Sequence, residues 1–137
     1  MENNNNMEME LSQAAIRYLL TIYELSDGGH PVRSVEIARA LAVTPASVSH
    51  MLHSLIKSRL VEKRYYGSVR LTSAGIRQAN LYYTRRAMLE TYFTTYLGVD
   101  AQVAQSDAAS CMYCLSPQSM EEIQRQLLTD RVHLAAI

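Results

Sequence analysis

The sequence lacks the features that would mark several classes of protein. No apolar run approaches the about 20 residues of a membrane-spanning helix. The first ten residues are acidic and Asn-rich, without the basic region and apolar stretch of a signal peptide. Two cysteines in 137 residues argue against a disulfide framework, so a reduced cytoplasmic setting is expected. No Ser/His/Asp set, carboxylate pair or phosphate-binding loop is visible, and we do not expect an enzyme.

The net charge of zero conceals an uneven distribution. Residues 33–86 contain ten Lys or Arg against two acidic residues, whereas residues 1–32 and 87–137 each carry a net charge of −4. A basic middle between acidic flanks is typical of a nucleic-acid-binding surface, although a solvated charged face would have the same composition. Hydrophobic residues make up 48% of the chain, which is enough for a folded core.

The pattern after residue 10 predicts an amphipathic helix. Residues 1–10 are expected to be a disordered lead-in. From Leu11 onward apolar residues recur at spacings of three and four, as on one face of a helix, and the segment DGGHP at residues 27–31 ends the pattern. The residues expected to face inward are Leu11, Ala15, Tyr18, Ile22 and Leu25.

The next segment has the pattern of a helix-turn-helix. Ser34 is expected to cap a short helix over residues 35–41, and Thr44 a second helix over about 45–58 that begins with Pro45. The turn between them is nearly minimal, as in DNA-binding helix-turn-helix motifs. The expected buried positions are Ile37, Ala38 and Leu41 in the first helix, and Val48, Leu52 and Leu55 in the second.

Two short strands and three further helices are expected beyond this motif. Residues 60–64 and 68–71 read as strands joined through Tyr65-Tyr66-Gly67, which forms a β-wing. Helices are then expected over about 73–97, 100–114 and 116–128. The predicted fold is therefore mainly α with a small wing: a winged helix-turn-helix domain at 11–72, then a linking helix and helical dimerisation domain at 73–137. The Met and Tyr residues of the second half are expected to pack in its core and in a dimer contact.

Several segments together carry a family resemblance. They are VRSVEIARALAVTPASVSHMLHSLIKSRLVEKRYYGSVRLT at 32–72, AIRYLLTIYEL at 15–25, and SDA at 106–108 followed by LS at 115–116. In this order they closely resemble the iron- and manganese-dependent repressors, the diphtheria-toxin-repressor-like regulators, over about residues 12–127. Because no SH3-like third domain follows, the chain is similar to the shorter, manganese-type branch. The resemblance implies a homodimeric transcription regulator that presents two winged domains to a palindromic operator in double-stranded DNA.

The predicted recognition helix begins with small polar residues. Such side chains allow a close approach to the major groove, where hydroxyls bond phosphates or bases and methyl groups contact thymine. His50, the longest of them, contacts either a base edge or a phosphate, or makes no contact. Basic wing residues would hold phosphates, making affinity salt-dependent. The predicted DNA-binding residues are Arg33, Arg39, Thr44, Ala46, Ser47, Ser49, His50, Lys63, Arg64 and Tyr66.

The resemblance also implies a divalent metal that joins the first helix to the dimerisation domain through carboxylates, His and sometimes Met or Cys. Here the corresponding positions hold Arg17, Leu20, Arg86, Ala109, Met112 and Tyr113, with Glu90 as the one accessory carboxylate. Arginine is permanently charged and does not ligate a cation, and Leu and Ala have no donor atom. No cofactor is therefore expected.

Several alternatives are open for what these positions do. Arg17 and Arg86 could form charge-assisted hydrogen bonds with Glu90 or Asp107 and hold the first helix without metal, which would make DNA binding constitutive. A pocket lined by Leu20, Met112 and Tyr113 could admit a small, anionic organic effector. Manganese, iron or zinc could still bind through unusual ligands, and a dimeric scaffold that does not bind DNA is a further alternative. The unusual ligands would be Glu90, Met112, Cys111 and Cys114.

Cys111 and Cys114 form a single C-x-x-C pattern on a predicted helix. One such pair is a weak indication of zinc, and no strand precedes it as in thioredoxin-like motifs. Helical phase places both sulfurs away from the face of Ala109, Met112 and Tyr113. Buried packing cysteines are the preferred interpretation, with thiol redox or soft-metal sensing as the alternative.

Overall fold

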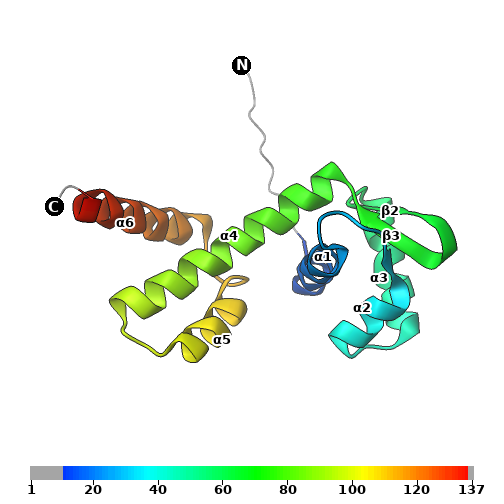
Figure 1. Cartoon of the computed structure of the whole chain (residues 1–137), viewed down its shortest axis with the longest axis horizontal. Coiled ribbons are helices and arrows are strands. Elements are labelled where there is room, and N and C mark those ends of the chain that lie inside the picture. The colour runs from blue at the N-terminus through cyan, green and yellow to red at the C-terminus, as the bar shows by residue number, and fades with distance from the viewer. Residues whose placement is uncertain (1–10, 136–137) are drawn as a thin grey trace, which may run out of the picture. The chain divides into compact units, whose positions relative to one another are not determined.

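A computed structural model describes residues 11–135 of the chain (Figure 1). The lead-in expected at residues 1–10 lies outside this range. The chain divides into two compact units, with the boundary between Ile76 and Arg77. The predicted fold class, mainly helical with a small sheet, is confirmed. No helix within the described range is long and apolar enough to cross a membrane.

The helices and strands follow the predicted order with one addition, the strand β1. Unit 1 contains the first elements and the start of α4, and unit 2 contains the rest of α4, α5 and α6. The bounds are α1 Gln13–Ser26, β1 Val32–Arg33, α2 Ser34–Leu41, α3 Pro45–Lys57, β2 Val61–Lys63, the 3-10 turn η1 Tyr65–Gly67, β3 Ser68–Leu71, α4 Ser73–Tyr96, α5 Ala101–Cys111 and α6 Pro117–Ala135.

Helix α1 buries most of its predicted inward face. Ala15, Tyr18 and Ile22 are buried, but Leu25 is 39% exposed, so its predicted inward position is wrong. The buried face continues from Ile22 by four residues to Ser26, whose hydroxyl donates to the carbonyl of Tyr23 at 2.7 Å. The inward face therefore runs from Ile22 to Ser26 and not from Ile22 to Leu25. Ser26 can be buried because its hydroxyl is hydrogen-bonded within the last turn of the helix.

The helix-turn-helix forms as predicted except at its first cap. Arg33, held in β1, is the N-cap of α2, and its backbone N–H donates to the Glu36 carboxylate at 2.8 Å. Ser34 is already inside the helix, so the prediction that it caps α2 is wrong. At α3 the prediction is confirmed, because the Thr44 hydroxyl accepts from the backbone N–H of Ser47 at 3.1 Å. Ile37, Ala38, Val48, Leu52 and Leu55 are buried, whereas Leu41 is half-buried.

The wing belongs to a three-stranded antiparallel sheet in the order β1-β3-β2. Val61 pairs with Leu71 across β2 and β3, and Val32 pairs with Val69 across β1 and β3. The two-residue strand β1 is too short to leave a sequence pattern, and the sequence did not predict it. At the wing tip, Tyr66 and Gly67 have φ of 57° and 71°, and the Ser68 hydroxyl donates to the Tyr65 carbonyl at 2.6 Å.

The start of α4 is fastened to the segment that follows α3. The Thr72 hydroxyl accepts from the N–H of Gly75 at 3.1 Å and donates to the carbonyl of Arg59 at 2.7 Å. Gly75 is buried against the Leu60 backbone, and a β-carbon there would collide with the Leu60 carbonyl oxygen. Only glycine therefore fits at this helix position.

In unit 2, two helices end at residues other than those predicted. Helix α5 ends at Cys111 rather than near Cys114, and α6 continues to Ala135 rather than stopping near Leu128. The Ser116 hydroxyl accepts from the N–H of Ser119 at 3.2 Å and so caps α6. The buried apolar side chains of unit 2 are Ala79, Leu89, Ala104, Ala108, Met112 and Met120.

We predict that Gly75→Ala lowers the free energy of unfolding by about 1–3 kcal/mol. Alanine alone would favour the helix by about 1 kcal/mol, but the Leu60 carbonyl is backbone and cannot move aside cheaply. Urea unfolding followed by circular dichroism measures the change. Ser73→Ala, at an exposed neighbouring position, is the control and should change stability by less than about 0.5 kcal/mol. A Gly75→Ala protein as stable as wild type would contradict the close contact.

Candidate nucleic-acid interface and the family metal positions

Helix α3 has one buried and one exposed face. Val48, Leu52 and Leu55 are buried, while the opposite face carries small and basic side chains. The exposed residues are Ala46, Ser47, Ser49, His50, His53, Ser54 and Lys57. Because the first turns carry only short side chains, the helix backbone can come close to a groove wall. Figure 1 shows α3 within unit 1, near the base of the wing strands.

Two of the predicted contact residues at the start of α3, Thr44 and Ser47, are linked by hydrogen bonds. The Thr44 hydroxyl donates to the Ser47 hydroxyl at 2.9 Å while it accepts from the Ser47 N–H. Thr44 is therefore mainly a cap, whereas Ser47 retains its own hydroxyl proton for an external acceptor. The positive end of the helix dipole favours an anion such as phosphate at this position.

The sequence reasoning missed His53 and Lys57 on the same helix. Both are exposed, and they follow His50 by three and seven residues, so all three lie on one face. The helical spacing from His50 was the available signal. The exposed face of α3 thus extends over its whole length and not only over its first turns.

The predicted phosphate-binding residues are all exposed in unit 1. Arg33 and Arg39 lie on β1 and α2, and Lys63 and Arg64 lie on the wing. Arg64 forms an ion pair with Glu62 at 2.9 Å, and both side chains are largely exposed. Such a surface pair is worth about 0–1 kcal/mol, so a phosphate can replace Glu62 as the partner of Arg64 at little cost.

Two tyrosines project from the wing tip. Tyr65 is 84% exposed and Tyr66 is 93% exposed, the highest values among the large hydrophobic residues described. The sequence predicted Tyr66 as a contact residue but missed Tyr65. The dipeptide immediately before Gly67 was the available signal. Exposed aromatic rings that carry a hydroxyl suit a surface that is covered by a polar partner.

The residues at the positions that the resemblance implies as metal ligands do not form a donor set suited to a hard cation. Arg17 is exposed and Leu20 is 5% exposed in unit 1, while in unit 2 the Arg86 guanidinium lies 4.7 Å from the Tyr83 ring centre. Met112 is 2% exposed, so its thioether packs in the core of unit 2. Ala109, Tyr113 and Glu90 are half-buried. Two guanidinium groups, two aliphatic side chains, a core thioether, a phenol and a single carboxylate do not fit a hard divalent cation.

No other group of residues substitutes for these ligands, because the described residues contain no cluster of three or more His, Cys, Asp or Glu side chains suited to a metal ion.

The sequence reasoning missed the charged side chain of Arg85. This residue is buried in unit 2, with its guanidinium 5.1 Å from the Tyr82 ring centre.

The cysteines differ from the buried packing pair that was expected. Cys111 is half-buried at the end of α5, and Cys114 is exposed in the following turn. Burial, Cys114 and Asp107 together raise the pKa of the Cys111 thiol. The prediction of buried packing is wrong for Cys114, because α5 ends three residues earlier than expected and the helical phase does not extend to this position.

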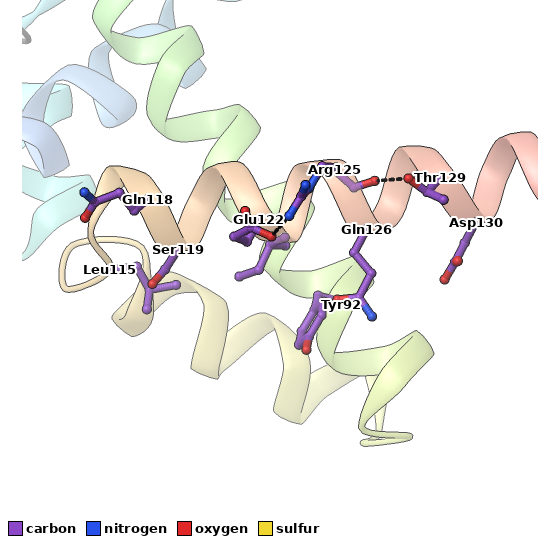
Figure 2. A pocket seen from close by; sticks show the side chains of 10 residues that line it. Tyr92, Leu115, Gln118, Ser119, Glu122, Arg125, Gln126, Thr129 and Asp130 are labelled. Atoms are coloured by element: carbon purple, nitrogen blue, oxygen red, sulfur yellow. Dashed lines mark hydrogen bonds and ion pairs between the residues drawn. The ribbon is translucent and has the colours of Figure 1, made fainter.

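Unit 2 also contains an open groove beside α6, with a volume of about 830 Å³ (Figure 2). Tyr92 of α4 and Leu115 lie along one side, and α6 contributes the remaining residues, among them the ion pair between Glu122 and Arg125. None of the candidate effector residues Arg17, Leu20, Arg86, Glu90, Ala109, Met112 and Tyr113 lines this groove.

Comparison with known proteins identifies the family. Residues 10–69 match the model described as iron dependent repressor, N-terminal DNA binding domain. The HTH-type transcriptional regulator MntR of Bacillus subtilis is 35% identical over 107 residues, which are 77% of this chain and 74% of MntR. The chain belongs to the iron- and manganese-dependent repressor family of transcription regulators.

One further relative and one solved structure are also similar to this chain. The uncharacterised HTH-type transcriptional regulator MJ0568 of Methanocaldococcus jannaschii is 25% identical over 115 residues, 83% of this chain and 92% of that protein. The fold is similar to the crystal structure of ScaR with bound Zn²⁺, with a TM-score of 0.74 at 23% identity over 82% of this chain. This family member spans about half of ScaR, 53% of its length. The predicted family resemblance is thereby confirmed.

We predict that a carboxylate cannot be introduced at position 20 without cost. Leu20→Glu would bury a carboxyl group in the core of unit 1 and remove apolar contacts, so the free energy of unfolding should fall by about 2–5 kcal/mol. Urea unfolding measures this loss. Arg17→Gln, at an exposed position on the same helix, is the control and should cost less than about 0.5 kcal/mol. Equal stability of the two variants would show that position 20 tolerates a ligand.

Proposed function

We propose that this repressor-family member is a homodimeric, sequence-specific DNA-binding protein whose DNA binding does not depend on a divalent metal. The observation that carries the proposal is the contrast between its two sites. The exposed face of α3 and the wing carry small, basic and aromatic groups suited to DNA, whereas the expected metal positions offer a single carboxylate, Glu90, which is too few hard donors for a divalent cation.

The DNA-binding role assigns different tasks to different residues. Ala46, Ser47 and Ser49 allow α3 to enter the major groove, and His50 contacts a base edge. Arg33, Arg39, Lys63 and Arg64 contact phosphates and set the register, while Tyr65 and Tyr66 contact the backbone beside the wing. The positive charge of residues 33–86 makes the affinity strongly salt-dependent.

The dimer is supported by apolar side chains that unit 2 leaves exposed. Leu97, Val103 and Leu128 are 60%, 46% and 53% exposed, and Leu128 lies on the helix that lines the groove. A second copy that packs against unit 2 would bury some of these side chains and present two recognition helices with two-fold symmetry. A palindromic operator is the DNA counterpart of that symmetry.

A metal-independent regulator is distinguished from a metal-responsive one by DNA binding itself. Fluorescence anisotropy on the region upstream of its own gene should give equal affinities in excess chelator and with added Mn²⁺, Fe²⁺ or Zn²⁺. The affinity should fall by about 10³–10⁵ between 50 and 200 mM salt if six to ten phosphates are contacted. ScaR, whose structure is described as that of a manganese-activated repressor, is assayed in parallel on its own operator as the control for metal addition.

Two results would contradict the proposal. Binding that requires one metal would favour a metal-responsive repressor that uses Glu90, Met112, Cys111 or Cys114. Absence of salt-sensitive binding under every condition would favour a dimeric scaffold. Binding that requires a small organic molecule would leave the metal independence intact and add an effector to it.

We predict that His50→Ala weakens binding to the operator by about 5–150-fold and reduces discrimination at one base pair, since a base-edge contact is worth about 1–3 kcal/mol. Anisotropy on operators with single substitutions measures both effects. His30→Ala is the control, because His30 is exposed in the loop after α1 and away from α3 in sequence. A uniform loss on all sequences would show that His50 contacts a phosphate instead.

A further inference from the structure

The two cysteines are held at opposite ends of one hydrogen-bonded turn. The N–H of Cys114 donates to the carbonyl of Cys111 at 2.9 Å, directly after the last helical bond of α5, from the N–H of Met112 to the carbonyl of Ala108 at 3.0 Å. A turn closed in this way keeps the first and fourth α-carbons within about 7 Å. A disulfide needs α-carbons about 4.4–6.8 Å apart, so the turn keeps the two α-carbons close to the distance that a disulfide requires.

The two thiols differ in their access to solvent. Cys114 is exposed, and its sulfur lies 3.9 Å from the carbonyl oxygen of Ser110, a weak contact that a side-chain rotation breaks. Cys111 is half-buried at the end of α5. A small oxidant therefore reaches Cys114 first, and Cys111 is positioned to react second.

We propose that Cys111 and Cys114 form a reversible dithiol–disulfide pair that is oxidised by hydroperoxides. The Cys114 thiolate attacks the peroxide O–O bond, so that its sulfur becomes a sulfenic acid and one oxygen leaves as water. The sulfur of Cys111 then attacks the Cys114 sulfur, and the hydroxyl leaves as water with the proton of the Cys111 thiol. Two thiols are oxidised to one disulfide, and hydrogen peroxide is reduced to two waters. An external dithiol then reduces the disulfide to the two thiols and is itself oxidised.

The location of the pair couples this reaction to the rest of unit 2. Met112, between the cysteines, is a core residue with 2% exposure, and Leu115, directly after Cys114, lines the groove beside α6. Closing the disulfide pulls Cys114 away from Ser110 and restrains the turn that connects α5 to α6. The regulatory part of the inference rests on the proposed function: because unit 2 carries the proposed dimer surface, oxidation weakens DNA binding.

The disulfide is tested without DNA. The reduced full-length protein is treated with a few equivalents of hydrogen peroxide, and free thiols and intact mass are measured before and after a reducing dithiol. We expect both thiols to be lost, a mass lower by two hydrogen atoms, and full recovery on reduction. Covalent dimers, or a sulfinic acid at Cys114 with Cys111 still free, would overturn the proposal.

Two matched variants assign the order of reaction. Cys111→Ser should stop at the sulfenic acid of Cys114, which dimedone traps, whereas Cys114→Ser should react more slowly and form no intramolecular disulfide. A dimedone adduct that forms in Cys114→Ser but not in Cys111→Ser would overturn the assigned order.

DNA affinity of the reduced and oxidised proteins, both in chelator, tests regulation separately. We expect oxidation to weaken binding by about fivefold or more, within the usual range of coupling between sites, and reduction to restore it. Equal affinity would overturn the regulatory part, while the disulfide assay still decides the chemistry. If the reduced protein itself does not bind DNA, the proposed function fails independently of the thiol result.

Discussion

The burial of one apolar stripe on α3 is the constraint on which the DNA-binding half of the molecule depends. Val48, Leu52 and Leu55 are at most 7% exposed, and each such side chain contributes about 1.5–3 kcal/mol when fully removed from water. Because the helix cannot rotate without exposing this stripe, the opposite face, with Ser47 and His50, must point to solvent. The core of unit 1 therefore determines which residues are available to DNA.

The wing depends on the same core through backbone contacts. Leu60, fully buried after α3, accepts the N–H of Thr72 at 3.0 Å and lies against Gly75, so the end of the wing and the start of α4 are joined to one carbonyl. The sheet register then places Tyr65 and Tyr66 at the exposed tip, where the Arg64 N–H and the Ser68 hydroxyl hold the turn by donating to backbone carbonyls. A wing that is anchored at its base and carries exposed aromatic side chains at its tip suits contact with a DNA backbone.

Unit 2 packs two of the side chains that the family resemblance implies as metal-ligand positions. Met112 is part of the hydrophobic core, where a thioether packs well. Arg86 lies over an aromatic ring, and cation–π contact of this kind stabilises a partly desolvated guanidinium. Under the proposed function, these two side chains stabilise unit 2 and do not hold a metal.

The sequence alone determined the helix-turn-helix, the wing and the family, because these follow from local periodicity, cap residues and motif order. Only the tertiary structure decided the exposure of Leu25 and Cys114 and the position of Ser34 inside α2. The strand β1 makes Arg33 the cap in place of Ser34, and its two residues are too few to carry a pattern. Leu25 is exposed because α1 turns its inward face to Ser26, and Cys114 is exposed because α5 ends at Cys111. Pairing between distant strands and the last turn of a helix depend on contacts that neighbouring residues in the sequence do not encode.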